Sequence, residues 1–340
     1  MLNFTGSYTN EPTIIGRQVL GKTTIMIISF IIPHKGRKEL LQATILSIAA
    51  QTYDLAQAEI IVVTQNKELS VNELLPDEDV KTSIVFRPES DTISALRNRG
   101  ADIATGTHLA FLDADVKLSP NWIVDMLSEL SLIDDRVLVS AVQRCSESAP
   151  PLEKIRTALS NASTDSNVDF LPGRNLLLTK ETYSRAGGFP EHLVTCEDYY
   201  FTNKVHNIGH LYYSSKADYV HLGEDKKYKE MFDKEIWRGQ SNLQSIKGRP
   251  IPLSEYPSFI VPIWILFFFI ATPLLILAGE PEISFIAFSL VCLPIALYSI
   301  RLYKVAGGTV RFYKIVQFYF AYFPARILGT FLGLFKVINI

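Results

Sequence analysis

Residues 108–115 read HLAFLDAD, a short apolar run that ends in two aspartates, Asp113 and Asp115. Such a run indicates a buried strand, so both carboxylates would stand at its carboxyl end. Ligands of open α/β sheets bind at that edge, and paired carboxylates there suit Mg²⁺ or Mn²⁺ bound against a substrate diphosphate. A solvated turn or a helix start is the alternative interpretation of the motif taken alone.

Outward from this motif, short apolar runs alternate with stretches of helical spacing. Strands are predicted at residues 25–32, 59–63, 84–86 and 108–112, and helices at 37–51 and 93–104. This alternation is typical of an α/β domain whose mostly parallel sheet is covered by helices on both faces. The polar stretch 146–169 separates this half from a second half that begins near Phe170.

The second half carries a further acidic pair and a histidine. Glu197 and Asp198 precede a predicted helix, and His221 follows a tyrosine-rich predicted strand. The acidic pair is either catalytic or an acidic helix start that interacts favourably with the helix dipole. His221 is either a metal ligand or a packed strand-end histidine.

The order of these pieces resembles a GT-A glycosyltransferase of family 2 over about residues 24–245. The matching pieces are SFIIPHKGR (29–37), QTY (51–53), EIIVV (59–63), ALRNRGAD (95–102), FLDAD (111–115), GRNLLLTKETYSRAGGFPE (173–191), CED (196–198), and His221 with WRG (237–239). The resemblance implies a Rossmann-like GT-A fold and transfer of a sugar from a nucleotide-sugar.

The resemblance also implies roles for individual residues. Asp113 and Asp115 would bind a divalent metal, Mg²⁺ or Mn²⁺, with His221 completing the set. Asp198 would be the general base, and Glu197 would hold a sugar, although the two acids are interchangeable at this stage. The residues expected at the nucleotide-sugar are Pro33, His34, Gly36, Arg37, Gln65, Arg97 and Asp113. Those expected on the acceptor side are Gly173, Asn175, Trp237 and Arg238.

Two departures from the family pattern concern the donor. Thr64-Gln65-Asn66 stands where the family often has an aspartate pair, and Gly36 stands where it often has asparagine. The identity of the nucleotide is therefore open. The Q-x-x-R-W motif of processive synthases is also missing from the sequence, which favours the addition of a single sugar.

The sequence after residue 256 is of a different kind. Residues 256–279 and 283–300 contain no charged side chain, and about 20 helical residues cross a bilayer. Two transmembrane helices are predicted within residues 257–303. The connector that follows holds Arg301, Lys304, Arg311 and Lys314 without an acid, so the positive-inside rule places the large domain in the cytosol.

The last stretch is less hydrophobic. Arg326 interrupts it, and at helical spacing Arg311, Lys314, Arg326 and Lys336 share one arc. This pattern predicts an amphipathic helix at 311–338 that lies on the membrane, with a third span as the alternative. The predicted organisation is a flexible lead-in (1–23), a GT-A domain (24–250), two spans (257–303) and this helix.

Composition restricts the partners and the compartment. A formal net charge of −2 argues against a nucleic-acid partner, and three dispersed cysteines suit a reducing compartment. We expect a multi-pass protein of the inner (cytoplasmic) membrane that binds a nucleotide-sugar and a lipid-linked or saccharide acceptor in surface-polysaccharide synthesis. The alternatives are transfer to a polyprenyl phosphate and a non-catalytic scaffold of the same fold.

Overall fold

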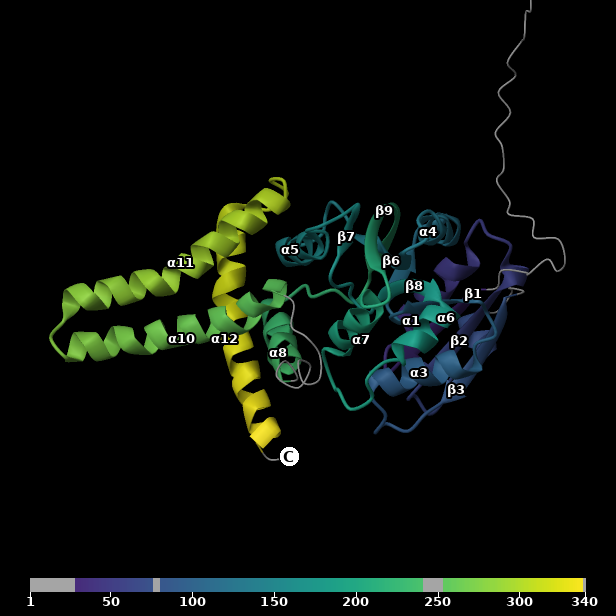
Figure 1. Cartoon of the computed structure of the whole chain (residues 1–340), viewed down its shortest axis with the longest axis horizontal. Coiled ribbons are helices and arrows are strands. Elements are labelled where there is room, and N and C mark those ends of the chain that lie inside the picture. The colour runs from purple at the N-terminus through teal and green to yellow at the C-terminus, as the bar shows by residue number, and fades with distance from the viewer. Residues whose placement is uncertain (1–27, 76–79, 241–252, 339–340) are drawn as a thin grey trace, which may run out of the picture.

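The computed structural model describes residues 28–75, 80–240 and 253–338. The expected lead-in at 1–23 lies outside these ranges, as do residues 241–252 of the predicted catalytic domain. Within them a single sheet has the strand order β3-β2-β1-β4-β8-β6-β9-β5, and β7 pairs with β9. The fold is therefore the predicted α/β type, with helices against the sheet (Figure 1).

The first half of the domain follows the predicted alternation closely. Its elements are β1 (Ile28–His34), α1 (Lys38–Ala49), η1 (Leu55–Gln57), β2 (Ala58–Thr64), α2 (Val71–Leu74), β3 (Lys81–Phe86), α3 (Ile93–Ile103), β4 (His108–Leu112), β5 (Val116–Leu118) and α4 (Trp122–Ser131). Strands β3, β2, β1 and β4 are mutually parallel. Every residue of β1 and β2 is buried, which explains their continuously apolar sequences.

The second half adds antiparallel pairs to this parallel core. Its elements are β6 (Arg136–Arg144), α5 (Pro151–Ser160), β7 (Ser166–Val168), β8 (Asn175–Thr179), α6 (Lys180–Ala186), α7 (Glu197–His206), β9 (His210–His221) and α8 (Tyr228–Gly239). Strand β8 is antiparallel to both β4 and β6, and Leu112 at the end of β4 faces Asn175 at the start of β8. This reversal brings residues 173–175 beside the two aspartates that follow β4.

Helix α3 lies close to the sheet because it carries Gly100. A Cβ at this position would collide with the Ile31 side chain of β1. The close approach also sets the position of Arg97, one turn earlier on the same helix. Thr92 caps the start of α3 by accepting a hydrogen bond from the Ala95 amide, as threonine commonly does at this position.

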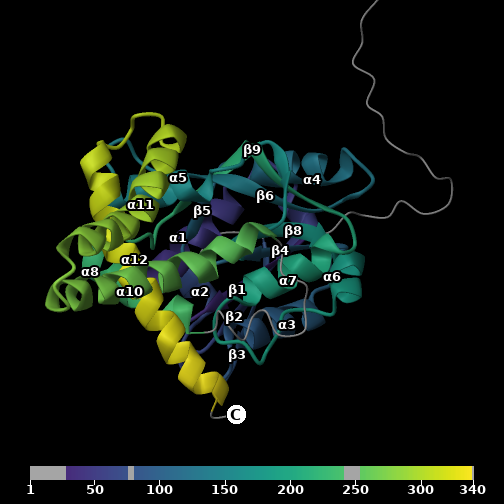
Figure 2. The same cartoon turned by 60° about the vertical axis from the view of Figure 1, so that its left-hand side comes forward.

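Three apolar helices follow η2 (Leu253–Glu255): α10 (Tyr256–Leu277), α11 (Pro281–Val305) and α12 (Phe312–Ile338). Each is long and apolar enough to cross a membrane. Helices α10 and α11 form a hairpin that projects away from the sheet, and α12 runs across the base of that hairpin (Figures 1 and 2). A buried apolar cluster joins the three helices to α5 and α8.

Helix α12 packs directly on α8 of the catalytic domain through glycine. A Cβ on Gly239 would lie 2.9 Å from the Cα of Gly329, and a Cβ on Gly333 would collide with the Gln240 carbonyl. Small residues four apart allow two helix backbones to approach closely. The Gly329-x-x-x-Gly333 spacing is the sequence signal for this contact.

The sequence predicted that the charged residues of α12 face the lipid headgroups, and for Arg326 the structure differs. The Arg326 side chain is only 12% exposed, and its Nη1 lies 3.7 Å from Oε2 of Glu235 on α8. Arg326 therefore faces the catalytic domain. Burial of a charged side chain requires a partner of opposite charge, and α8 supplies it.

Candidate active site

Arg97 connects the two acidic pairs that lie far apart in the sequence. Its guanidinium is buried and donates to Asp113 Oδ1 at 2.9 Å and to Glu197 Oε1 at 2.8 Å. Burial opposes the charged form, but the two carboxylates outweigh it and raise the pKa of Arg97. The structure thus places this arginine between carboxylates, whereas the family resemblance placed it on the diphosphate.

Gly173 makes room for this arrangement. A Cβ there would lie 2.9 Å from Nη2 of Arg97, and the Gly173 amide donates to Asp198 Oδ2 at 3.3 Å. The Gly173 carbonyl accepts from Arg97 at 3.3 Å. One glycine therefore contacts both Arg97 and the acid expected to act as base.

Asp198 stands, partly buried, at the start of α7. Its Oδ1 accepts from the Tyr199 amide at 2.9 Å. Burial raises the pKa of Asp198 and also that of Glu197, in the second case with help from the neighbouring Asp198 charge. A carboxylate with a raised pKa is a better proton acceptor near neutral pH.

The backbone before this pair is strained. Cys196 has a φ of 63°, which is uncommon for a residue with a side chain and concentrates at functional sites. Contacts made by neighbouring residues on both sides of Cys196 support this backbone conformation. Thr195 Oγ1 donates to the Arg238 carbonyl at 3.2 Å, and Phe201 of α7 stacks on Phe189 with ring centroids 3.9 Å apart.

Asp115 and His221 form a second cluster in the site, here named the Asp115 centre; the cluster around Asp198 is the Asp198 centre. Their Oδ1 and Nε2 atoms lie 3.3 Å apart, and His221 Nδ1 lies 3.0 Å from Glu224 Oε2. Burial alone would lower the pKa of His221, but its hydrogen bonds to the two carboxylates raise it. The same histidine charge holds the pKa of Asp115 below its usual value, against the effect of burial.

Asp115 is also confined from its other side. Arg37, an exposed residue, brings Nη2 to 3.4 Å from Asp115 Oδ2. A Cβ on Gly223 would collide with the same carboxylate oxygen. Glycine at position 223 therefore leaves the space that the Asp115 carboxylate occupies.

The loop after β1 is tied to the loop after β2. The Gly36 amide donates to Asn66 Oδ1 at 2.8 Å, and Asn66 Nδ2 donates to the Gly36 carbonyl at 2.9 Å. Gly36 has a φ of 93°, a conformation that favours glycine over the family's asparagine. Among the other predicted donor residues, Pro33 and His34 end β1, and His34 Nδ1 lies 2.9 Å from Thr64 Oγ1.

Gln65 and Asn175 serve the scaffold through the contacts they make. Gln65 Nε2 donates to the carbonyls of Pro88 and Asp91, both at 2.9 Å. Asn175 was expected on the acceptor side, but it is fully buried and accepts from the Trp122 indole at 3.1 Å. It lies inside the core because β8 pairs with β4 at this point.

Trp237 and Arg238 end helix α8. Trp237 is exposed, whereas the Arg238 side chain pairs with Glu235 on the same helix. The Arg238 backbone carbonyl accepts from Thr195 and Cys196, in the loop before Glu197. Asp113 is partly exposed and contacts Arg97. Of the two aspartates after β4, Asp115 is the one whose carboxylate contacts His221.

Three site residues, Arg174, Gly223 and Glu224, were not predicted from the sequence. Arg174 Nη1 lies 3.4 Å from Glu224 Oε2 and 3.1 Å from Gln143 Oε1, and Gly223 borders Asp115. The short segment HLGE (221–224) was an available signal, because an acid three residues after a histidine lies within reach of its ring. Arg174 gave no comparable signal beyond its place in the GRN segment.

The donor atoms at this centre fit a divalent ion that is also bound by substrate. Among the residues that the structure describes, no group of three or more His, Cys, Asp or Glu side chains is arranged to hold a metal. Asp115 and His221 would supply two ligands, and Mg²⁺-type sites often use one or two carboxylates with phosphates and water. Glu224 on Nδ1 orients the ring of His221 so that Nε2 faces Asp115, as outer-shell carboxylates orient metal-bound histidines.

Comparison with known proteins agrees with the fold that carries this site. Residues 29–189 match the model of glycosyl transferase family 2. The chain is 21% identical over 257 residues to glycosyltransferase AglE of Haloferax volcanii, covering 74% of this chain and 84% of that protein. The fold is similar to that of the mannosyltransferase PcManGT from Pyrobaculum calidifontis in complex with GDP-Man and Mn²⁺. That match has a TM-score of 0.59 and 15% identity, and it covers 91% of this chain and 87% of the other. The chain is therefore a glycosyltransferase with a GT-A fold, and residues 29–189 of its catalytic domain match family 2, whose members transfer sugars from nucleotide-sugars.

Proposed function

We propose that this enzyme transfers one sugar, with inversion, from a nucleotide-sugar to a lipid-linked saccharide acceptor at the cytoplasmic face of a membrane. The observation that carries the proposal is the Arg97 bridge between Asp113 and Glu197. It brings the acids after β4 and the acids at the start of α7 into one site. Donor activation and acceptor deprotonation require such proximity.

The donor diphosphate would lie between the loop after β1 and the Asp115–His221 pair. Arg37 extends from that loop, is exposed, and already contacts Asp115. A guanidinium at this position suits phosphate oxygens. Asp115 and His221 would hold a divalent ion, which neutralises charge on the leaving nucleoside diphosphate.

The acceptor hydroxyl would lose its proton to Asp198. Attack on the anomeric carbon from the face opposite the diphosphate inverts its configuration, and a single carboxylate base is sufficient for that step. Glu197 is held by Arg97 through Oε1, so we assign it to sugar positioning. Arg97 itself acts as a positioning residue for Asp113 and Glu197.

The hairpin α10–α11 supports the membrane assignment. Both helices have spanning length and composition, and their shared base lies beside the catalytic domain (Figure 1). The connector with Arg301, Lys304, Arg311 and Lys314 stands at that base, which favours a cytoplasmic catalytic domain. We propose that α12 lies along the membrane surface, because it packs on α8 and crosses the hairpin.

The proposal predicts a defined product. Purified enzyme with Mn²⁺, lipid-linked saccharides and a panel of nucleotide-sugars should release nucleoside diphosphate with one donor far above the others. The new glycosidic bond should have the anomeric configuration opposite to that of the donor, as determined by NMR of the product. Release that does not depend on a saccharide acceptor, or retention of configuration, would contradict it.

The raised pKa values of Glu197 and Asp198 predict an acidic limb in the rate profile. Turnover requires the ionised base, so kcat should be full above the raised apparent pKa and should fall as the pH decreases through it. The midpoint should lie above 3.8, the ordinary value for aspartate, and belong to the acidic pair as a whole. Because the folded-state pKa is raised, protonation of this pair should not destabilise the fold. Initial rates from pH 4 to 8, with parallel melting curves, test both statements; a flat profile is the contrary result.

A further inference from the structure

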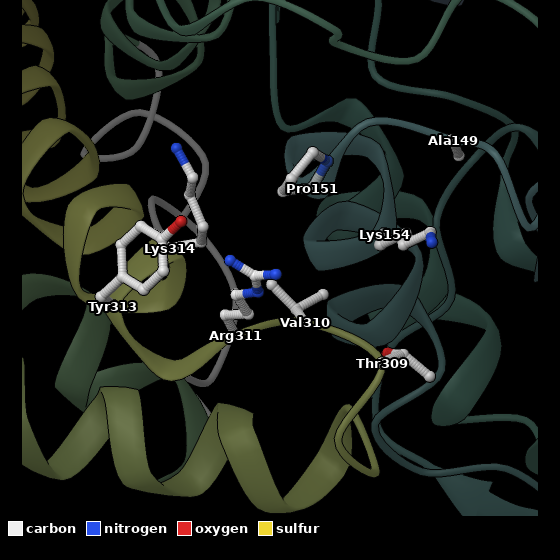
Figure 3. Close-up of a pocket in the computed structure, with 8 residues that line it drawn as sticks. All are labelled: Ala149, Pro151, Lys154, Thr309, Val310, Arg311, Tyr313 and Lys314. Carbon is white, nitrogen blue, oxygen red and sulfur yellow. The ribbon is translucent and has the colours of Figure 1, made fainter.

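A separate cavity lies where the catalytic domain meets the membrane helices. It has a volume of about 310 Å³ and lies between the start of α5 and the segment that leads into α12. Figure 3 shows Lys154 on the α5 side and Arg311 and Lys314 on the α12 side. None of the residues that line it belongs to the Asp115 or Asp198 centres.

The charge in this cavity is of one sign. Lys154, Arg311 and Lys314 contribute three cations, and no carboxylate lines the cavity. Within residues 28–75, 80–240 and 253–338, none of the three forms an ion pair with an acid. The Lys314 ammonium donates to the amide oxygen of Gln317 at 3.3 Å and lies 5.3 Å from the Tyr313 ring centroid, so its charge is not compensated.

The position of the cavity relative to the hairpin indicates its level in a membrane. Helix α11 ends at Val305 and α12 begins at Phe312, so Arg311 and Lys314 stand at the hairpin's base. If α10 and α11 cross the bilayer, this base lies at the level of the lipid headgroups. Thr309 adds a hydroxyl and Tyr313 an amphipathic ring to the lining, and tyrosine is enriched at this level of membranes.

We propose that this cavity binds the phosphate group of a membrane lipid. Arg311 would contact two phosphate oxygens through its planar guanidinium, and the two lysines would add point charges from opposite walls. The volume suits a headgroup, whereas the acyl chains would remain in the bilayer. Such binding would hold α5 and α12 together at the membrane surface. The proposal rests on the membrane placement of the hairpin and is independent of the sugar transfer.

Lipid titration of the full-length chain in a neutral detergent tests the proposal. Phosphatidylglycerol should bind, whereas phosphatidylcholine, which is zwitterionic, should bind at least tenfold more weakly. We expect each cation that lines the cavity and contacts the lipid phosphate to contribute about fivefold in affinity, the size of one lysine or arginine contribution at an anionic lipid surface. The double variant Arg311→Gln/Lys314→Gln should therefore weaken phosphatidylglycerol binding about 30-fold, as measured by native mass spectrometry or by lipid-dependent thermal stabilisation.

The matched control removes two other cations from the same end of the hairpin. Arg301→Gln/Lys304→Gln changes the net charge equally, but both residues are exposed on α11 and do not line the cavity. It should change the affinity no more than about twofold. If the α12 double variant does not fold, Lys154→Gln on the opposite wall should still weaken binding about fivefold.

Three results would overturn the proposal: equal binding of phosphatidylcholine, equal loss in the control double variant, or inorganic phosphate binding as tightly as the lipid. A parallel titration with a polyprenyl diphosphate distinguishes the source of the phosphate. Tighter binding of this probe than of phosphatidylglycerol, lost in the Arg311/Lys314 variant, would assign the cavity to a lipid-linked acceptor. The reverse order would assign it to a bilayer phospholipid, and either order supports a lipid phosphate site.

Discussion

Asp198→Asn is expected to lower kcat by about 10²–10⁴-fold, the range that a positioned general base contributes, while donor affinity stays within about twofold. The amide is close in shape to the carboxylate but does not accept the hydroxyl proton. The Gly173 and Tyr199 amides donate to different oxygens of the carboxylate, so the single oxygen of the asparagine amide keeps one of these two hydrogen bonds. Steady-state nucleotide release gives kcat, and isothermal titration of the donor with Mn²⁺ gives the affinity.

Two variants accompany this measurement. Asp134→Asn makes the same chemical change at an exposed acid and should leave both quantities unaltered. Glu197→Gln should weaken sugar positioning and change KM more than Asp198→Asn does. If Glu197→Gln instead abolishes turnover while Asp198→Asn does not, the two roles are exchanged. If both variants retain turnover, the acceptor requires no base, as for transfer to a phosphate.

The parallel part of the fold was predictable because its signals are local. β4 occupies residues 108–112 as expected, and β2 and β3 differ from the predicted ranges only at their ends. β1 continues two residues past its predicted end, and residues 25–27 of that prediction lie outside the described residues. The signal for each strand is a short apolar run, and the signal for each helix between them is a regular helical spacing of apolar residues. The positions of Asp113 and Asp115 follow directly, since they come immediately after a buried strand.

The contacts of individual site residues depended on tertiary structure and were less predictable. Asn175 and Gly173 are two residues apart, yet one is sealed in the core by β4 and the other contacts Arg97 and Asp198. The antiparallel pairing of β8 with β4 decides this difference. The hydrogen bond from Arg97 to Glu197 likewise depends on tertiary structure, because the two residues are 100 positions apart in the sequence.

A line of buried charges connects the Asp115 centre with the C-terminal apolar helices. Glu224 contacts His221 on one side and Arg156 on the other, where Nε lies 3.5 Å from Oε1. Arg156 Nη1 lies 3.0 Å from Glu235 Oε1, and Glu235 meets Arg326 of α12. Each buried charge needs its neighbour, so α12 stabilises the groups that orient His221. This dependence explains why a charged residue, Arg326, stands in the middle of α12.

Asp115→Ala should eliminate metal-dependent donor binding, weakening it by more than about 100-fold. In the proposed arrangement Asp115 and His221 are the two protein ligands, and removal of one leaves His221 with Glu224 alone. The expected loss exceeds the 10–100-fold typical of removing an outer-shell partner. Titration of the nucleotide-sugar with and without Mn²⁺ measures the loss, with Asp134→Ala as the matched exposed-acid control.

A graded series makes this prediction specific to the metal. Glu224→Gln should weaken metal-dependent binding about 10–100-fold, because the ring of His221 loses its carboxylate partner while both direct ligands remain. Gly223→Ala should act in the same direction, since the added Cβ displaces the Asp115 carboxylate. Donor binding measured with EDTA should be equally weak in all four proteins, wild type included. Metal-dependent binding that survives Asp115→Ala would remove this aspartate from the metal site and assign the ion to Asp113.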